Sequence, residues 1–448
     1  MSPARQTQGR RHHAAVWRFH FYAGLVVIPF FVMAALTGLA IVLKTPADHL
    51  FHHDRLVVEA GEARLPATEI VSAVLARDPH RTVEAYIVPQ GADRSVQLHT
   101  VMAHGGEEHT SHTPAGRVSF ADPYTGEILG ESELGGSLAD WAQSVHGTLL
   151  MGEVGDVLLE IVAGFGILLL GTGLYLYWPA GRKTRPAPGR GLWRRLHGVT
   201  GVSVSFVLLF FLVSGLAWTP VWGGRLTQAW GAFPAERFAA PAGEARHAAL
   251  NRPGARIIPW ALETTPLPLP GQARPDATPV TLDDVVRFAQ SEGFDGYRIL
   301  LPRGALGVFT ISATTMSGDI RDPRRDRTVH IDPASGAVLG DAAFAEYSLG
   351  GKAMAAGIAL HQGNAGPVNI LVNVLACLAV LAMSISGFAM WWARRPAGRR
   401  WAPAPLASPD TWRRVSLILL MISLLAPLTA LVLAGILAIE AGIVRLGR

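Results

Sequence analysis

The stretch Leu192–Pro220, LWRRLHGVTGVSVSFVLLFFLVSGLAWTP, combines a basic edge, a histidine and a long apolar run. Two arginines come first, His197 follows them, and Val199–Trp218 then contains no charged residue over 20 positions. An apolar helix of about 20 residues is long enough to cross a bilayer. A histidine where such a helix enters the membrane is costly without a partner, so His197 is a candidate functional residue.

Near its N-terminus the chain repeats this order in Val16–Val42, VWRFHFYAGLVVIPFFVMAALTGLAIV. There Arg18 and His20 precede the apolar run Gly24–Leu43. A cleavable signal peptide is the alternative interpretation of this run, but its length and the histidine at its edge favour a retained helix. His20 is therefore a second candidate functional residue.

The composition is typical of an integral membrane protein. Of the 448 residues, 50% are hydrophobic and only 16% are charged, and the apolar residues gather in long runs. The runs long enough to cross a membrane are Gly24–Leu43, Val157–Trp178, Val199–Trp218, Val368–Trp392 and Val415–Ile439. We therefore expect a membrane all-α helical bundle of about five transmembrane helices, surrounded by lipid.

The basic residues predict the orientation of the chain. They concentrate in the N-terminal tail, between the second and third runs, and between the fourth and fifth runs, so the positive-inside rule places these segments in the cytoplasm. Residues 44–155 and 219–367 then lie outside, in the periplasm of a bacterium with this protein in its inner membrane. The other predicted parts are 1–43, 156–218, 368–392, 393–414 and 415–448. The net charge of +5 is thus explained by the basic residues of the cytoplasmic segments. No nucleic-acid partner is expected.

The two outer segments are predicted to hold matching periplasmic α+β modules. The first has a helix from Thr68 and an Asp-Pro-Tyr-Thr-Gly turn at Asp122; the second has a helix from Thr281 and an Asp-Pro-Ala-Ser-Gly turn at Asp332. The strand-like runs are Val83–Val88, Ser95–Val101 and Arg117–Phe120 in the first module, and Tyr297–Leu301, Val308–Ser312 and Thr328–Ile331 in the second. The only cysteine, Cys377, lies in an apolar run, so neither module contains a disulfide.

After each turn comes another histidine and then another apolar run. His146 and His361 occupy this position in the two halves. The order predicts a duplication of two-helix repeats, roughly residues 1–185 and 190–396, arranged in parallel about a two-fold axis along the membrane normal. That symmetry pairs His20 with His197 at the cytoplasmic edge, and His146 with His361 at the outer edge.

Two histidines that face each other across a helical bundle can ligate a planar cofactor or a metal. Neutral imidazole pairs suit haem iron, whereas zinc normally takes further ligands. Arginines near the inner pair, Arg18, Arg194 and Arg195, could meet haem propionates. The alternative is that each histidine is only a polar anchor at the membrane surface. Four histidines at repeat-related positions favour ligation, and we expect two b-type haems.

A histidine-rich loop has no counterpart in the second half. It contains His104, His109 and His112 among glycines and glutamates. Such a tract can bind a transition metal loosely, and a solvated loop without metal is the alternative.

These motifs together resemble the PepSY-associated transmembrane protein family. The resemblance rests on the Arg-x-His and Arg-Arg-Leu-His approaches to a helix, the two Asp-Pro turns, the second histidines, and the Tyr-Trp-Pro and Trp-Trp-Ala-Arg-Arg helix ends, over residues 12 to about 400. It implies an iron-regulated inner-membrane protein and, as in some members, a di-haem enzyme that reduces ferric siderophores in the periplasm. Some relatives carry a fused flavoprotein reductase. No nucleotide-binding pattern follows Trp392, so a separate cytoplasmic reductase or quinol is the expected electron donor.

The expected function is therefore electron transfer through two haems to a periplasmic ferric chelate or siderophore. A haem-free permease for a metal chelate is an alternative, and so is a membrane-anchored regulatory protein that binds partners. The permease is less favoured, because too few membrane-buried polar groups, Glu160, Asn369 and Asn373, line a path.

Overall fold

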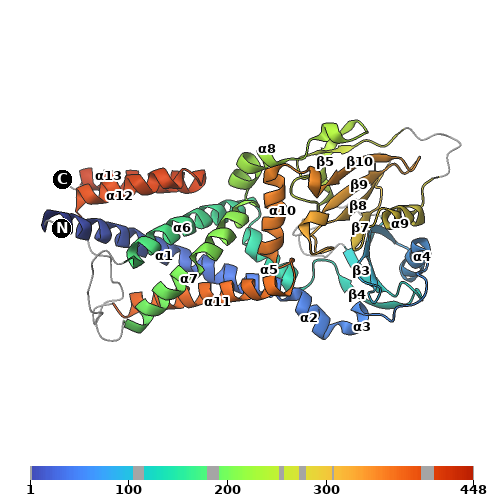
Figure 1. Ribbon diagram of the computed structural model, residues 1–448, viewed down its shortest axis with the longest axis horizontal. Helices are drawn as coiled ribbons and strands as arrows, with labels where there is room; N and C mark the ends of the chain where they lie inside the picture. Colours follow the sequence, from blue (N-terminus) through green and yellow to red (C-terminus); the bar gives the residue numbers. More distant parts are fainter. Residues whose placement is uncertain are drawn as a thin grey trace. The chain divides into compact units, whose positions relative to one another are not determined.

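The structure is a computed structural model that describes residues 3–103, 116–178, 191–251, 257–271, 279–304, 307–394 and 408–446. The chain forms two compact units (Figure 1). The helical unit comprises Met1–Leu39, Ser144–Thr227 and Leu371–Arg448. The sheet unit comprises Ala40–Gln143 and Gln228–Ile370.

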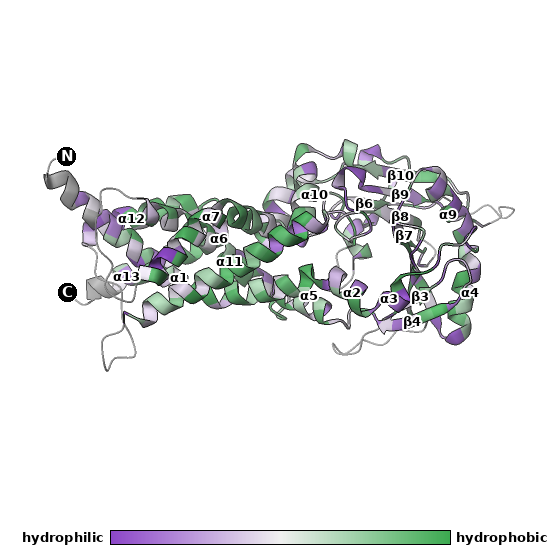
Figure 2. Ribbon diagram, turned by 60° about the horizontal axis from the view of Figure 1, so that its bottom comes forward, coloured by the Kyte–Doolittle hydropathy of each residue, from purple (hydrophilic) through white to green (hydrophobic). Residues whose placement is uncertain are grey.

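Four helices of the described chain are long and apolar enough to cross a membrane. They are α1 (Pro3–Val42), α6 (Glu153–Tyr177), α7 (Gly191–Leu216) and α11 (Pro367–Trp392). Large apolar side chains point outward from them, among them Phe206 and Leu371, and Figure 2 shows hydrophobic residues along α6, α7 and α11. A helix satisfies its own backbone hydrogen bonds, and the side chains on the outside of these helices are apolar. Both properties are required of a segment surrounded by lipid. The chain is a multi-pass membrane protein.

The expectation of a fifth transmembrane helix is wrong. The run Val415–Ile439 is divided between α12 (Pro409–Ser423) and α13 (Pro427–Leu446). The break falls where Pro427 removes a backbone donor and disfavours helical geometry in the residue before it. At about 1.5 Å per residue, the 15 residues of α12 fall short of a hydrocarbon core of about 30 Å.

α12 and α13 pack against each other as a helical hairpin on α1 and α6. At its open end, Glu440 accepts a hydrogen bond from the Trp412 indole at 2.8 Å and lies 3.7 Å from Arg18 of α1. At its turn, the Thr429 hydroxyl donates to the Ile161 carbonyl of α6 at 3.2 Å. The open end of the hairpin therefore lies at the N-terminal part of α1, whereas its turn lies against the first half of α6.

The sheet unit contains one antiparallel eight-stranded sheet, in the order β10-β9-β8-β7-β1-β2-β3-β4 (Figure 1). Its strands are β1 (Arg81–Val88), β2 (Val96–Met102), β3 (Gly116–Ala121), β4 (Ile128–Glu133), β7 (Tyr297–Leu300), β8 (Phe309–Ala313), β9 (Arg327–Ile331) and β10 (Val338–Ala343). Each predicted module supplies four consecutive strands, and β1 pairs with β7, with Tyr86 opposite Ile299. The two modules therefore share one sheet and one core.

Local sequence explains the ends of these elements. Helix α9 (Leu282–Ser291) begins with the expected capping box, in which Thr281 and Asp284 bond to each other's backbone N–H groups. Helix α4 (Ala67–Arg77) is its counterpart in the first module, and both contribute to the core of the sheet. In the Asp-Pro turns, Asp122 and Asp332 each accept a backbone N–H two residues ahead, at 2.7 and 3.1 Å.

Shorter elements connect the helices to the sheet. They are α2 (Lys44–Phe51), α3 (His53–Leu56), α5 (Leu138–Thr148), a π-helix (Pro220–Thr227), α8 (Gln228–Gly231), the pair β5 (Ala242–Arg246) and β6 (Pro266–Pro268), α10 (Leu349–Gln362), and short 3-10 turns at Ala235–Arg237, His247–Leu250, Pro323–Arg325 and Phe344–Glu346.

Candidate functional site

Two of the predicted histidines lie next to each other in the helical unit. The imidazole of His20 on α1 and that of His197 on α7 have ring centroids 6.3 Å apart, with ring planes at 88°. A metal–imidazole bond is about 2 Å long and the ring centre lies roughly 1 Å beyond, so imidazoles on opposite sides of one metal have centroids about 6 Å apart. The separation would therefore allow both imidazoles to bind one metal ion.

Hydrogen bonding assigns the tautomer of His20. Its Nδ1 lies 2.9 Å from Oγ1 of Thr172 on α6, and that hydroxyl donates its own hydrogen to the Leu168 carbonyl at 2.7 Å. The Thr172 oxygen must therefore accept, and Nδ1 of His20 carries the proton. In the neutral imidazole this leaves Nε2 unprotonated, with its lone pair available to a metal.

His197 is held in the same way by α11. Its Nδ1 lies 3.0 Å from the Met383 carbonyl and 3.3 Å from Oγ of Ser386. A carbonyl can only accept a hydrogen bond, so Nδ1 carries the proton here too. Ser386 in turn donates to the Ala382 carbonyl at 2.7 Å. Again Nε2 is the basic nitrogen.

His146, on α5, shows the arrangement a third time. Its Nδ1 lies 2.9 Å from Oγ1 of Thr37 on α1, and Thr37 donates to the Met33 carbonyl at 2.8 Å. Burial lowers the pKa of His146 below its ordinary value, which favours the neutral imidazole. A neutral ring with its Nδ1 proton engaged is the usual state of a metal-ligating histidine.

Each of the three rings also lies against a glycine. A Cβ atom added at Gly173 would lie 3.2 Å from Cε1 of His20, and one at Gly387 would lie 3.4 Å from Cε1 of His197. The corresponding distance from Gly38 to Cε1 of His146 is 3.7 Å, and the sulfur of Cys377 lies 3.4 Å from the same position. The glycines leave room beside the rings that a side chain would fill.

In all three places the glycine directly follows the hydroxyl residue that holds the histidine. We call Thr37–Gly38, Thr172–Gly173 and Ser386–Gly387 the hydroxyl–glycine pairs. The histidines were identified from the sequence, but the three hydroxyl residues that hold them were missed. The signal that identifies them is a serine or threonine before a glycine inside an apolar run.

The predicted propionate partners differ in their surroundings. Arg18 is engaged by the helical hairpin, because its guanidinium lies 3.7 Å from Glu440 and 5.2 Å from the ring centre of Trp412. Arg194 and Arg195 are exposed on α7, three and two residues before His197, respectively. These two arginines are the better placed to meet an anionic group near the inner histidines.

The fourth histidine, His361, lies near the C-terminal end of α10 in the sheet unit. His146 belongs to the helical unit, and the pairing of these two residues stays a prediction. His104, His109 and His112 lie outside the described residues. Among the residues that are described, no group of three or more His, Cys, Asp or Glu side chains is arranged to hold a metal ion.

Glu160, one of the polar residues considered for a transport path, has a structural role. It is fully buried on α6, and its two carboxylate oxygens accept backbone N–H groups of Val221 and Trp222 at 3.0 and 3.1 Å. These two residues lie in the π-helix after α7. The Trp222 indole then donates to the Leu425 carbonyl in the turn of the hairpin at 3.1 Å. Glu160 thus fixes the π-helix and, through it, the hairpin.

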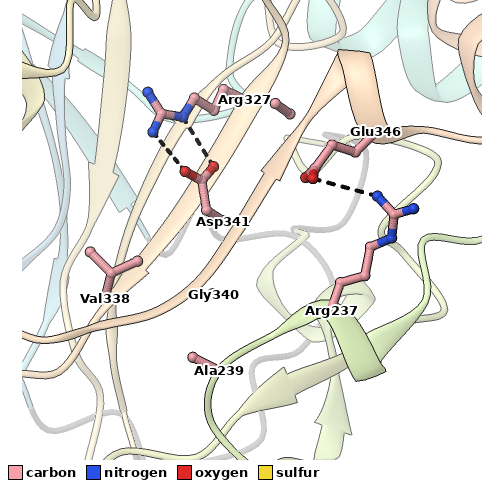
Figure 3. A pocket seen from close by; sticks show the side chains of 8 residues that line it. Arg237, Ala239, Arg327, Val338, Gly340, Asp341 and Glu346 are labelled. Carbon is pink, nitrogen blue, oxygen red and sulfur yellow. Dashed lines mark hydrogen bonds and ion pairs between the residues drawn. The ribbon is translucent and has the colours of Figure 1, made fainter.

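The sheet unit has a surface groove of about 550 Å³ along the edge strand β10 (Figure 3). Arg327 forms a two-fold ion pair with Asp341, at 3.0 and 2.6 Å, and also contacts Glu292 at 2.9 Å. Arg237 makes a looser ion pair of 3.4 Å with Glu346, and both of these side chains are about half exposed. The volume is in the range of small-ligand sites.

The fold and the site define a class: a multi-pass membrane protein whose helices hold anchored, neutral histidines, joined to a sheet-containing unit. The model of the PepSY-associated TM region matches residues 17–394. The chain belongs to this family, as the resemblance of its motifs had indicated. A search of curated proteins finds no match to the chain.

Proposed function

We propose that this protein carries two b-type haems and passes electrons across the bacterial inner membrane to a periplasmic ferric chelate of the siderophore type. His20 and His197 ligate the inner haem, and His146 and His361 ligate the outer one. The observation that carries the proposal is the common state of three histidines, each with Nδ1 anchored and Nε2 left basic.

The residues fit a haem at the inner position. His20 and His197 would hold the group, because their imidazoles are 6.3 Å apart, glycines lie against their edges, and exposed arginines precede His197. A low-spin bis-histidine haem, when bound, supplies one-electron transfer without an open coordination position. The protein's part is to hold the rings: Thr172 and the Met383 carbonyl fix the ring orientations and increase the basicity of Nε2.

The direction of transfer follows from the arginine-rich segments, which place the N-terminus and the inner pair on the cytoplasmic side. A separate cytoplasmic reductase or quinol is the donor. The sheet unit lies in the periplasm, and its groove beside Arg237 is our candidate site for the chelate. The similar strand order of β1–β4 and β7–β10 supports the proposed duplication.

A haem-free permease and a regulatory partner-binding protein are the alternatives. The permease loses support because Glu160, which would line its path, is occupied in holding the π-helix. No comparable observation favours a regulatory role.

The absorption spectrum of the purified protein tests the proposal. We expect about two b-type haems per chain and sharp low-spin bands in the reduced protein without added ligand. Rapid mixing of the reduced protein with a ferric siderophore should reoxidise both haems. A colourless protein from haem-replete cells would refute the proposal and favour the permease.

A further inference from the structure

The three hydroxyl–glycine pairs share one detail of hydrogen bonding. Thr37, Thr172 and Ser386 are all buried, and each donates its hydroxyl hydrogen to the carbonyl four residues earlier, at 2.7 to 2.8 Å. Each has a weaker second contact to the carbonyl three residues earlier, at 3.1 to 3.3 Å. With its hydrogen used inside the helix, the oxygen can only accept, and in all three cases an imidazole Nδ1 approaches it.

A fourth residue, Ser214 on α7, has the same properties. Its side chain is 5% exposed, and its hydroxyl donates to the Phe210 carbonyl at 2.7 Å, with a second contact to Phe211 at 3.3 Å. Gly215 follows it directly. Its oxygen is therefore prepared to accept a hydrogen bond in the same manner as Thr37, Thr172 and Ser386.

The position of Ser214 along its helix matches that of Thr37. From His20 to Thr37 is 17 positions along α1, and from His197 to Ser214 is also 17 positions along α7. At about 1.5 Å per residue, both hydroxyls lie roughly 25 Å along their helices from the inner histidine. Since Thr37 anchors His146, the equivalent position on α7 is suited to a second outer imidazole.

We propose that Ser214 is a positioning residue for the outer haem, and that Ser214–Gly215 is a fourth hydroxyl–glycine pair. Its partner would be a ligand of the outer haem other than His146, which Thr37 already holds. The inference rests on the proposed function. Ser214 would hold the Nδ1 proton of the ligand, fix the ring orientation and raise the basicity of Nε2.

The experiment compares Ser214→Ala with Thr37→Ala and with Ser214→Thr in the full-length protein. Loss of a residue that orients a metal ligand weakens metal binding by about 10- to 100-fold. We expect Ser214→Ala to lower outer-haem affinity by this factor and to shift the reduction potential and low-spin electron-spin-resonance signal of that haem alone. Thr37→Ala should change the same haem, and Ser214→Thr should restore the normal signal.

Ser205→Ala is the matched control, because Ser205 lies on the same helix and donates to the Val202 carbonyl at 2.9 Å from an exposed position. It should leave both haems unchanged. If Ser214→Ala lowers the yield of folded protein, Ser214→Cys keeps the side-chain size with a much weaker acceptor.

The inference would be overturned if the folded Ser214 variants kept the wild-type affinity and signal of the outer haem while Thr37→Ala altered them. The proposed function would then remain intact. Wild-type protein without haem would instead refute the proposed function.

Discussion

Nδ1 of His20 lies 2.9 Å from Oγ1 of Thr172, and the same hydroxyl donates to the carbonyl of Leu168. One threonine therefore determines both the tautomer of the histidine and the direction in which its basic nitrogen can act.

Replacing either inner histidine should remove the same haem. We expect His20→Ala and His197→Ala each to lose one of two haems, with the double variant losing no more than either single one. Residues that act as one unit are not additive. Haem content by pyridine haemochrome assay measures the loss. If His20→Ala and His146→Ala removed the same haem, the assignment of inner and outer pairs would be wrong.

Thr172→Val should weaken the inner haem without removing its ligands. The change removes the hydroxyl that accepts the Nδ1 proton of His20, and we expect about 10- to 100-fold weaker haem binding. Thr172→Ser keeps the hydroxyl and should behave as wild type. Titration of the haem-depleted protein with haemin gives the affinity. Equal affinities for the valine and serine variants would contradict the role of the hydroxyl.

Gly173 and Gly171 provide a matched pair on α6. A Cβ at Gly173 lies 3.2 Å from Cε1 of His20, whereas one at Gly171 has no atom within 4 Å. Both changes to alanine should favour the helix by about 0.5–1 kcal/mol. Only Gly173→Ala should move the imidazole and shift the inner-haem spectrum. A spectral change of similar size in Gly171→Ala would show that the effect is not local.

The sheet unit should lose stability in mild acid. His247 and His330 are fully buried with their Nε2 atoms 2.8 Å apart; burial lowers the pKa of His247 to about 4 and also depresses that of His330. The unfolded chain binds these protons first as the pH falls below about 6.5. Stability is therefore complete above pH 6.5 and decreases toward pH 4, by on the order of 3 kcal/mol for His247.

Thermal unfolding followed between pH 7 and pH 4 measures this loss. The double variant His247→Leu/His330→Leu should show a weaker dependence on pH, because it removes both members of the buried pair. His80→Gln, at an exposed position, is the control and should follow the wild type. An unchanged pH dependence in the double variant would contradict the prediction.

The helical hairpin should place the C-terminal end of α13 on the same side of the membrane as the N-terminus. A reporter fused after Gly442 should read cytoplasmic, on the same side as the N-terminus, because Glu440 returns to Arg18. A reporter fused after Gly271 should read periplasmic. A fifth membrane crossing would instead move the first reporter to the periplasm, so the two arrangements give opposite signals.

The apolar runs predicted four helices because length and hydropathy alone decide membrane insertion. The fifth run was wrongly predicted to be a single helix. Pro427 alone does not identify the break, because α1 continues through Pro29. Tertiary contacts stabilise the turn between α12 and α13: Trp222 donates to the carbonyl of Leu425, and Thr429 donates to that of Ile161. Such contacts between distant segments leave no periodic signal in the sequence.

The candidate site was predictable only in part. Histidines at helix ends can be found in the sequence. The hydroxyl residues that hold them cannot, because a serine or threonine before a glycine also occurs where no histidine is bound. Thr200–Gly201 on α7 has the same letters as Thr172–Gly173, yet Thr200 is only partly buried. Which hydroxyl faces a ring depends on how the helices pack.

The pairing of β1 with β7 has a consequence for biogenesis. Tyr86 and Ile299 are neighbours in the sheet but 213 positions apart in the chain, with helices α6 and α7 between them. During synthesis, the strands β1–β4 are complete long before β7 is made, and their β1 edge stays open until two further helices have been inserted. An open edge strand invites pairing with other chains. Slow translation or stalled insertion should therefore expose this protein to aggregation at one defined edge.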